Sequence, residues 1–129
     1  TGGGAADMGR RIRVSTIDQL DRTQLLFSSP IDVELSGKAP GFPGLLRDVW
    51  RGRGFGDFWG YGLVAEGAAE AMVEVGVSVW DLAAPVVLVE EAGGRFTDLD
   101  GERRIDTRTM LASNGLLHEV ILARLHRVA

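Results

Sequence analysis

The sequence predicts an α/β fold, a layered sandwich in which helices flank a largely parallel sheet. Short apolar runs of strand length alternate along the chain with longer segments whose apolar residues recur at helical spacing. Such alternation is typical of α/β domains. The chain has 129 residues, of which 45% are hydrophobic and 25% charged, and this is enough for one domain with its own core.

The first half of the chain is expected to hold two strands and one helix. Residues 1–10 form a Gly-rich start that we expect to be flexible, and residues 11–129 form the α/β domain. A first residue of Thr, followed by GGGAAD, predicts a fragment that lacks its upstream part. In order, we expect a strand over Arg11–Ser15, a turn or short helix to Asp21 and a strand over Gln24–Ser29. A loop over Pro30–Pro43, with room for a short helical turn, and a helix over Phe42–Trp50 follow.

The second half contains the clearest alternation. Gly93-Gly94 is a helix stop, and Asn114-Gly115 is a turn before the last helix. We expect a brief strand within Arg51–Asp57, a helix over Asp57–Ala69, a strand over Ala71–Val77, a helix over Val79–Ala92, strands over Arg95–Leu99 and Thr109–Ser113, and a helix from Leu116 to about Arg127.

Composition excludes several functional classes. The net charge is −4 and no basic block occurs, so nucleic acid is not an expected partner. Cys is absent, which excludes disulfides, thiolate metal sites and Cys nucleophiles. No run approaches the ~20 apolar residues that span a bilayer, so we expect a cytoplasmic protein without a membrane partner. His118 and His126 are expected at the surface or at helix ends rather than as ligands.

The segment Arg51–Asp57 is rich in glycine but matches neither common phosphate-loop pattern. Its glycines have a structural interpretation, tight turns before a helix. They also have a functional one, in which Gly56 lets a ligand approach the helix N-terminus. Arg53 would add positive charge to such a site, whereas Asp57, a plausible N-cap, would favour a cationic or hydrogen-bond-donating group.

Asp81 stands where a strand turns into an apolar helix. Ser78 and Asp81 have the spacing of a capping box, which is the structural interpretation. Pro85 cannot donate to the carbonyl of Asp81, so the first turn is expected to kink or the helix to start late. An acid beside freed backbone groups also suits a hard cation such as Mg²⁺. Glu74 is its best companion, because a strand end and the following helix start meet at one sheet edge.

The stretch Trp80–Asp98, WDLAAPVVLVEEAGGRFTD, resembles the C-terminal signature of the Mg²⁺-dependent inositol monophosphatase superfamily. In that signature W-D-x-A-A is followed by an apolar run and E-A-G-G-x-x-T-D. The likeness extends from about Arg11 to Leu125 and implies the C-terminal half of an αβαβα phosphatase fold. The run from Gly56 to Gly67, GDFWGYGLVAEG, is more similar to the histidinol-phosphate phosphatase branch than to the inositol branch.

The resemblance implies a role for each candidate. Asp81 would be the family's C-terminal metal ligand, and therefore the catalytic residue of this chain. Gly56, Asp57 and Glu74 would hold the part of the substrate that is not phosphate, and Arg53 would support that pocket. Inositol enzymes usually carry Thr or a small residue at position 57, so Asp57 would bind the amine or imidazole of histidinol.

The resemblance also implies what this chain lacks. The remaining metal ligands of the family lie upstream, in G-E-E and D-P-I-D-G-T motifs that do not occur here. Ser29-Pro30-Ile31-Asp32 imitates the second motif, but Val33-Glu34 replaces Gly-Thr, so we reject it as a metal site. The expected partners are therefore a phosphate ester, the missing N-terminal half and, as is common in the family, a second copy in a homodimer.

Three functions stay open on the sequence. The first is a Mg²⁺-dependent histidinol-phosphate phosphatase of histidine biosynthesis, of which this chain is an inactive C-terminal fragment. The second is an inositol-1-phosphate or sugar-phosphate phosphatase of the same superfamily. The third is a non-catalytic binding or assembly half-domain.

Overall fold

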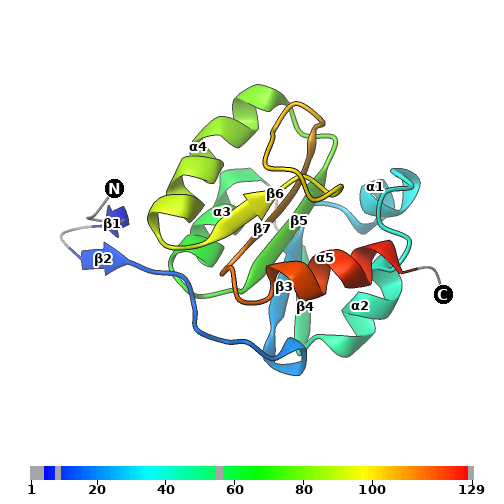
Figure 1. Ribbon diagram of the computed structural model, residues 1–129, viewed down its shortest axis with the longest axis horizontal. Helices are drawn as coiled ribbons and strands as arrows, with labels where there is room; N and C mark the ends of the chain where they lie inside the picture. The colour runs from blue at the N-terminus through cyan, green and yellow to red at the C-terminus, as the bar shows by residue number, and fades with distance from the viewer. Residues whose placement is uncertain (1–4, 8–9, 55–56, 128–129) are drawn as a thin grey trace.

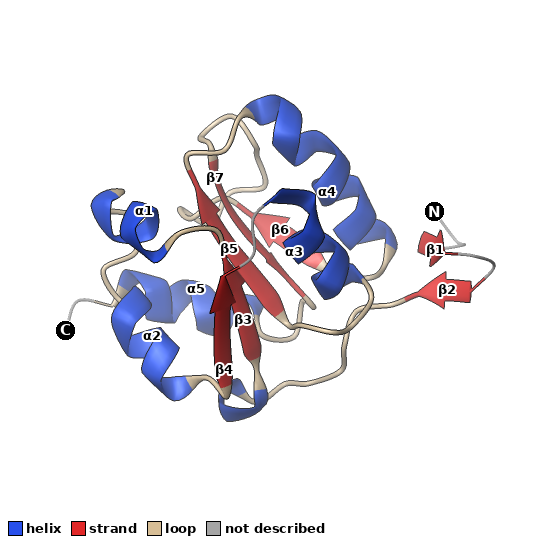
Figure 2. Cartoon of the chain, turned by 180° about the vertical axis from the view of Figure 1, so that it is seen from behind, coloured by secondary structure: helices blue, strands red, loops and turns tan. Residues whose placement is uncertain are grey.

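A computed structural model describes residues 5–7, 10–54 and 57–127. A five-stranded sheet in the order β4-β3-β5-β7-β6 forms its centre (Figures 1 and 2). The strands are β3 (Gln24–Phe27), β4 (Arg51–Gly54), β5 (Ala71–Val75), β6 (Arg95–Thr97) and β7 (Thr109–Ser113). The helices are α1 (Pro30–Leu35), α2 (Phe42–Asp48), α3 (Asp57–Ala65), α4 (Val79–Glu91) and α5 (His118–His126).

Four of the five strands point in one direction. β3 runs parallel to both β4 and β5, whereas β7 lies antiparallel between β5 and β6. The largely parallel sheet is confirmed, with β7 as the strand that departs from it. β6 and β7 are adjacent strands joined by a loop without a helix. Adjacent parallel strands would need a long crossover connection, so these two run antiparallel.

Helices cover both faces of the sheet, which gives the three layers expected. α1, α2 and α5 lie on one face, and α3 and α4 lie on the other (Figure 2). Successive side chains of β3 point to opposite faces of the sheet. Leu25 and Phe27 therefore pack on the first face, and Leu26 packs on the second. Each face therefore has its own core.

Several predicted boundaries differ from the structure. The expected loop after β3 contains α1, a six-residue helix that begins at Pro30. Instead of a strand over Arg11–Ser15, the structure has a hairpin of β1 (Ala5–Asp7) and β2 (Arg10–Ile12). Beyond β2 the chain has no regular structure up to η1 (Leu20–Arg22), a single 3₁₀ turn.

Both histidines occupy the ends of α5, as expected, but His118 is not on the surface. It is fully buried, and its two ring nitrogens lie 2.8 Å from Thr97 Oγ1 and 2.7 Å from Ser113 Oγ. Burial lowers the pKa of His118 to about 4, and the nearby Arg95 acts in the same direction. A neutral imidazole thus joins β6, β7 and α5.

Candidate active site

The candidate site lies at one edge of the sheet, where β5 ends and α4 begins. Because β3, β4 and β5 are parallel, their carboxyl ends lie at this common edge, from which α3 and α4 also start. Gly76 makes the turn out of β5 with a φ of +73°, a conformation that favours glycine. This turn brings the helix start of α4 beside the end of β5.

Asp81 occupies the first turn of α4, and Ser78 is the N-cap, as the predicted spacing implies. Ser78 Oγ accepts a hydrogen bond from the Asp81 backbone N–H at 3.3 Å and donates one to Asp81 Oδ2 at 2.9 Å. Pro85 lies inside α4, yet the helix already begins at Val79, so Pro85 does not delay its start. The cap holds the Asp81 carboxylate in place at the positive end of the helix.

Glu74 lies on the second-to-last position of β5 and is only 7% exposed. Its Oε1 accepts a hydrogen bond from the hydroxyl of Tyr61, which α3 places above the strand. Burial raises the pKa of Tyr61, and the charge and hydrogen bond of Glu74 raise it further. Tyr61 therefore stays protonated and acts as a donor that orients the Glu74 carboxylate.

Glu74 and Asp81 line one pocket of about 320 Å³. Its polar side-chain groups are two carboxylates, the Tyr61 hydroxyl and the indole N–H of Trp80, and none of its lining residues within the described part of the chain is cationic. Trp80, 89% exposed, forms part of the wall. Such a pocket attracts cations and hydrogen-bond donors, and an indole face also attracts alkylammonium groups. The complete lining is Tyr61, Glu74, Val77, Trp80, Asp81, Ala84 and Pro85.

The other three predicted residues follow β4. Arg53 is exposed on this edge strand, where it pairs in register with Leu26, and it is not among the described residues that line the pocket. Gly56 lies outside the described residues. Asp57 is the first residue of α3 and stands one helical turn before Tyr61. The structure thus unites Glu74 and Asp81 in one pocket and puts the start of α3 at the same edge.

Tyr61 is the site residue that sequence reasoning missed. A signal was present, because α3 is apolar apart from its first residue, and a Tyr hydroxyl that is buried needs a partner. That partner lies 13 residues away on β5, so no local pattern names it.

The acids of this edge do not by themselves make a complete metal site in the described part of the chain. Among the residues described, no three His, Cys, Asp or Glu side chains form a group that could hold a metal ion. Mg²⁺ often takes only one or two carboxylates, together with water and substrate phosphate. The exposed, capped carboxylate of Asp81 has the hard oxygen donors that this ion prefers, so the donor chemistry fits one ligand of a larger site.

The apparent metal motif at Ser29–Asp32 is a helix start. Ser29 is the N-cap of α1 and its Oγ accepts from the Asp32 backbone N–H at 3.3 Å. In the structure this segment thus serves as the N-terminus of α1. No helix in the described ranges has the length and apolar character needed to cross a membrane.

Comparison with known proteins identifies relatives of the whole chain. The family model for the inositol monophosphatase family matches residues 4–129. A histidinol-phosphatase of Mycobacterium tuberculosis is 47% identical over 116 residues, which cover 90% of this chain and 45% of that protein. A histidinol-phosphatase of Streptomyces coelicolor is 42% identical over 117 residues, covering 91% and 44%. The chain spans about half the length of these relatives.

Solved structures give the same result for the fold. An inositol monophosphatase from Anabaena superposes with a TM-score of 0.87 at 31% identity, over 99% of this chain and 55% of that one. The extragenic suppressor protein SuhB from Bartonella henselae gives a TM-score of 0.88 at 26% identity, over 99% and 51%. The chain therefore belongs to the inositol monophosphatase family and corresponds to its C-terminal region.

Proposed function

We propose that this chain is the C-terminal part of a Mg²⁺-dependent phosphomonoesterase that hydrolyses histidinol phosphate to histidinol and phosphate, a reaction of histidine biosynthesis. The observation that carries the proposal is the pocket shared by Glu74 and Asp81, which offers carboxylates and no described cation. Two relatives that carry the name histidinol-phosphatase, at 42% and 47% identity, support the same substrate.

The two carboxylates would have different partners. Asp81 would ligate Mg²⁺, because it is exposed and held by Ser78. Glu74, buried and oriented by Tyr61, would accept a hydrogen bond from the alcohol part of the substrate. The ion, when bound, would supply charge neutralisation at the phosphate and activation of the attacking water. The residues of this chain would bind, orient and shield the ester beside it.

The start of α3 would complete the substrate contacts. Gly56 would allow the ligand close to the helix N-terminus, and Asp57 would bind the cationic amine or imidazole of histidinol. Arg53 would support this wall from β4. These three roles rest on the family resemblance and on the position of α3 at the same sheet edge as Glu74 and Asp81.

The proposal includes parts that lie beyond this chain. An N-terminal half would supply the remaining metal ligands, so residues 11–129 would form the C-terminal domain of a larger enzyme and would be inactive alone. A homodimer in the cytoplasm is also proposed, on the family resemblance. Release of phosphate from histidinol phosphate by the isolated chain at a normal enzymatic rate would refute the requirement for the upstream half.

The variant Asp57→Thr tests the choice of substrate. It is measured in a protein that contains both this chain and the proposed N-terminal half. We expect a fall in kcat/KM for histidinol phosphate of at least about tenfold, the equivalent of one lost charge-assisted contact. Turnover of inositol 1-phosphate, measured in parallel, should not fall. Equal loss on both substrates, or inositol 1-phosphate as the better substrate of the unmodified protein, would favour the inositol branch instead.

A further inference from the structure

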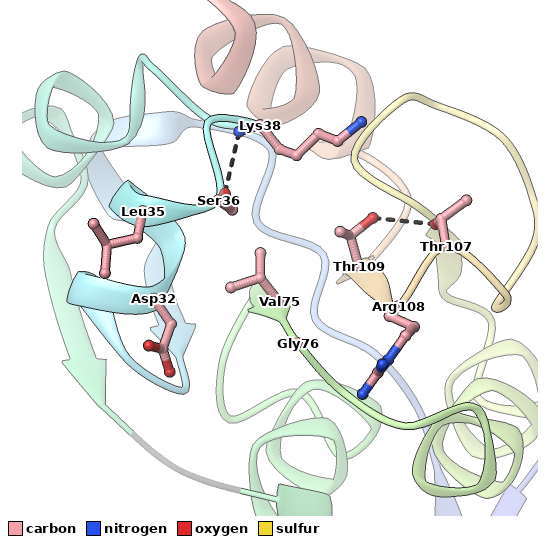
Figure 3. A pocket seen from close by; sticks show the side chains of 9 residues that line it. All are labelled: Asp32, Leu35, Ser36, Lys38, Val75, Gly76, Thr107, Arg108 and Thr109. Atoms are coloured by element: carbon pink, nitrogen blue, oxygen red, sulfur yellow. Dashed lines mark hydrogen bonds between the residues drawn. The ribbon is translucent and has the colours of Figure 1, made fainter.

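A second pocket lies on the other face of the sheet, beside the same end of β5. It has a volume of about 600 Å³, and its floor is the last pair of the β5–β7 ladder, Val75 and Thr109 (Figure 3). Figure 3 shows α1 as one wall and the start of β7 as the opposite wall. The lining is Asp32, Leu35, Ser36, Lys38, Val75, Gly76, Thr107, Arg108 and Thr109, and the proposed phosphatase function uses none of these residues.

Arg108 is the most unusual residue of this pocket. Its φ is +63°, and it is the single residue other than glycine with positive φ in the described ranges. Arg108 holds Val77 twice, since its carbonyl accepts from the Val77 N–H at 3.3 Å and its Nε donates to the Val77 carbonyl at 3.2 Å. An unfavourable backbone conformation of this kind persists where the surrounding contacts maintain it and is a reason to look for function.

The Arg108 guanidinium keeps donors for a ligand. Within the described part of the chain, its hydrogen bond to Val77 uses only Nε, and the side chain is exposed. Lys38 adds a second cation, which pairs with Asp100 at 3.4 Å in a contact that is about half exposed on both sides. Exposed ion pairs of this kind contribute little and are readily exchanged. The pocket therefore offers two cations to an anionic group.

Asp32 adds a negative charge to this otherwise cationic pocket. It lies in the first turn of α1, across the pocket from Arg108 in Figure 3. A simple anion would be attracted by Arg108 and Lys38 but repelled by Asp32. A molecule that carries an anionic group at one end and a hydrogen-bond-donating cation at the other satisfies both walls.

We propose that this pocket binds a small zwitterion, whose phosphate or carboxylate lies against Arg108 and Lys38 and whose ammonium group faces Asp32. Val77, which Arg108 holds, is itself part of the wall of the pocket that contains Glu74 and Asp81. The two pockets thus share one link, the segment between β5 and α4. A ligand that binds the guanidinium of Arg108 changes the strength of its hydrogen bond to the Val77 carbonyl. Ligand binding is therefore expected to affect the segment that leads into α4.

The test is a titration of the ¹⁵N-labelled chain followed by NMR in metal-free buffer. Phosphoethanolamine is the phosphate probe and β-alanine the carboxylate probe, and propyl phosphate is the matched compound without the ammonium group. We expect saturable shifts of the Arg108 Nε–H signal and of the Val77 amide with phosphoethanolamine or β-alanine. Whichever of the two binds more tightly identifies the anionic group, and propyl phosphate should bind more weakly than phosphoethanolamine.

Three variants assign the binding. Arg108→Gln should weaken it by about tenfold or more, as loss of a charged hydrogen bond does. Lys38→Gln should weaken it by about threefold, since Lys38 already pairs with Asp100 in an exposed contact. Asp32→Asn should abolish the preference for phosphoethanolamine over propyl phosphate. Lys38 and Asp32 are surface residues, so these variants carry the test even if Arg108→Gln does not fold.

Asp81→Asn distinguishes the two pockets. If the probe binds at the proposed site, Asp81→Asn binds it with the same affinity as the unmodified chain. If this variant loses binding, the probe occupies the pocket of Glu74 and Asp81 instead. Shifts that do not saturate, or affinities that are equal in the unmodified chain and in both cation variants, overturn the proposal. The outcome does not depend on phosphatase activity, so failure here leaves the proposed function standing.

Discussion

The hydroxyl of Tyr61 donates a hydrogen bond to Glu74 Oε1, which joins α3 to β5 at the end of the strand that leads to Asp81. Both side chains are almost fully buried, at 2% and 7% exposed. The pair is thus an internal support for the candidate pocket, and its partners come from two elements that meet only in the folded chain.

Tyr61→Phe should lower both stability and substrate binding. The ring is kept but the donor is lost, so a buried carboxylate loses one hydrogen bond, at a cost of about 1–3 kcal/mol. We expect urea unfolding at a lower midpoint and, in the protein supplied with its upstream half, a higher KM with less effect on kcat. Trp59→Phe, an exposed change two residues earlier, serves as the control. Equal unfolding midpoints and equal KM for Tyr61→Phe and the unmodified protein contradict this role.

Ser78 and Asp81 should separate capping from chemistry. Ser78→Ala removes the oxygen that accepts from the Asp81 N–H and should cost about 1 kcal/mol of stability. Asp81→Asn leaves that cap in place and loses only the favourable charge at the helix N-terminus, about 0.3–1 kcal/mol. For phosphatase activity the order is reversed, with Asp81→Asn the more damaging change. Both variants are compared by thermal unfolding and by phosphate release. If the same variant is the more damaging one in both measurements, these roles of Ser78 and Asp81 are wrong.

Two glycines of α3 form a matched pair. A Cβ at Gly60 would lie 2.0 Å from Met72 Sδ in the core, whereas a Cβ at Gly62 meets nothing within 4 Å. Gly60→Ala should therefore destabilise the chain by about 1–3 kcal/mol through overpacking. Gly62→Ala should stabilise it by up to about 1 kcal/mol, because Ala favours helix. Chemical denaturation of both variants checks the sign, and two changes of the same sign contradict the packing between α3 and β5.

His118 should make stability fall in acid. Its pKa is lowered to about 4 in the folded chain, against about 6.5 unfolded, so the unfolded chain binds more protons between these values. The contribution is fully present above pH 6.5 and is lost as the pH falls from 6.5 toward 4, by at most about 3 kcal/mol.

The measurement for His118 is urea unfolding at pH 4.5 and pH 7.5, compared with His118→Gln. Gln keeps hydrogen-bonding capacity but does not titrate, so the variant should lose less stability on acidification than the unmodified chain. The difference between the two proteins isolates the contribution of His118. Equal pH dependence in the two proteins would mean that His118 is not held neutral by its site.

Local signals predicted the part of the fold around the candidate site. Ser78 and Asp81 have the spacing of a capping box, and in the structure Ser78 caps the helix while its hydroxyl donates to the Asp81 carboxylate. The strand predicted over Ala71–Val77 and the apolar helix predicted after it place Glu74 near Asp81, because the short turn between β5 and α4 leaves few other arrangements. These features depend on neighbours in the chain, which is why a single sequence shows them.

What the sequence did not predict depends on distant partners. His118 lies on an amphipathic pattern that suits a surface helix, yet hydroxyls of Thr97 and Ser113 make a buried site for it. For residues 30–43 the sequence favours a loop with room for a short helical turn, but it does not show that Ser29 caps this helix or that Val33 packs on the sheet. The direction of β7 was missed because alternation of elements says nothing about strand direction. The absence of a helix between Leu99 and Thr109 was the available clue.

The central proposal is that Asp81 is a magnesium ligand in a phosphatase for histidinol phosphate. The direct measurement is phosphate release from histidinol phosphate as a function of Mg²⁺ concentration, by the protein supplied with its upstream half and by its Asp81→Asn variant. We expect Mg²⁺-dependent turnover in the former, and in the variant a fall in kcat of at least about a hundredfold or a marked increase in the Mg²⁺ concentration required. Turnover that is independent of Mg²⁺, or that is unchanged by Asp81→Asn, would contradict the account.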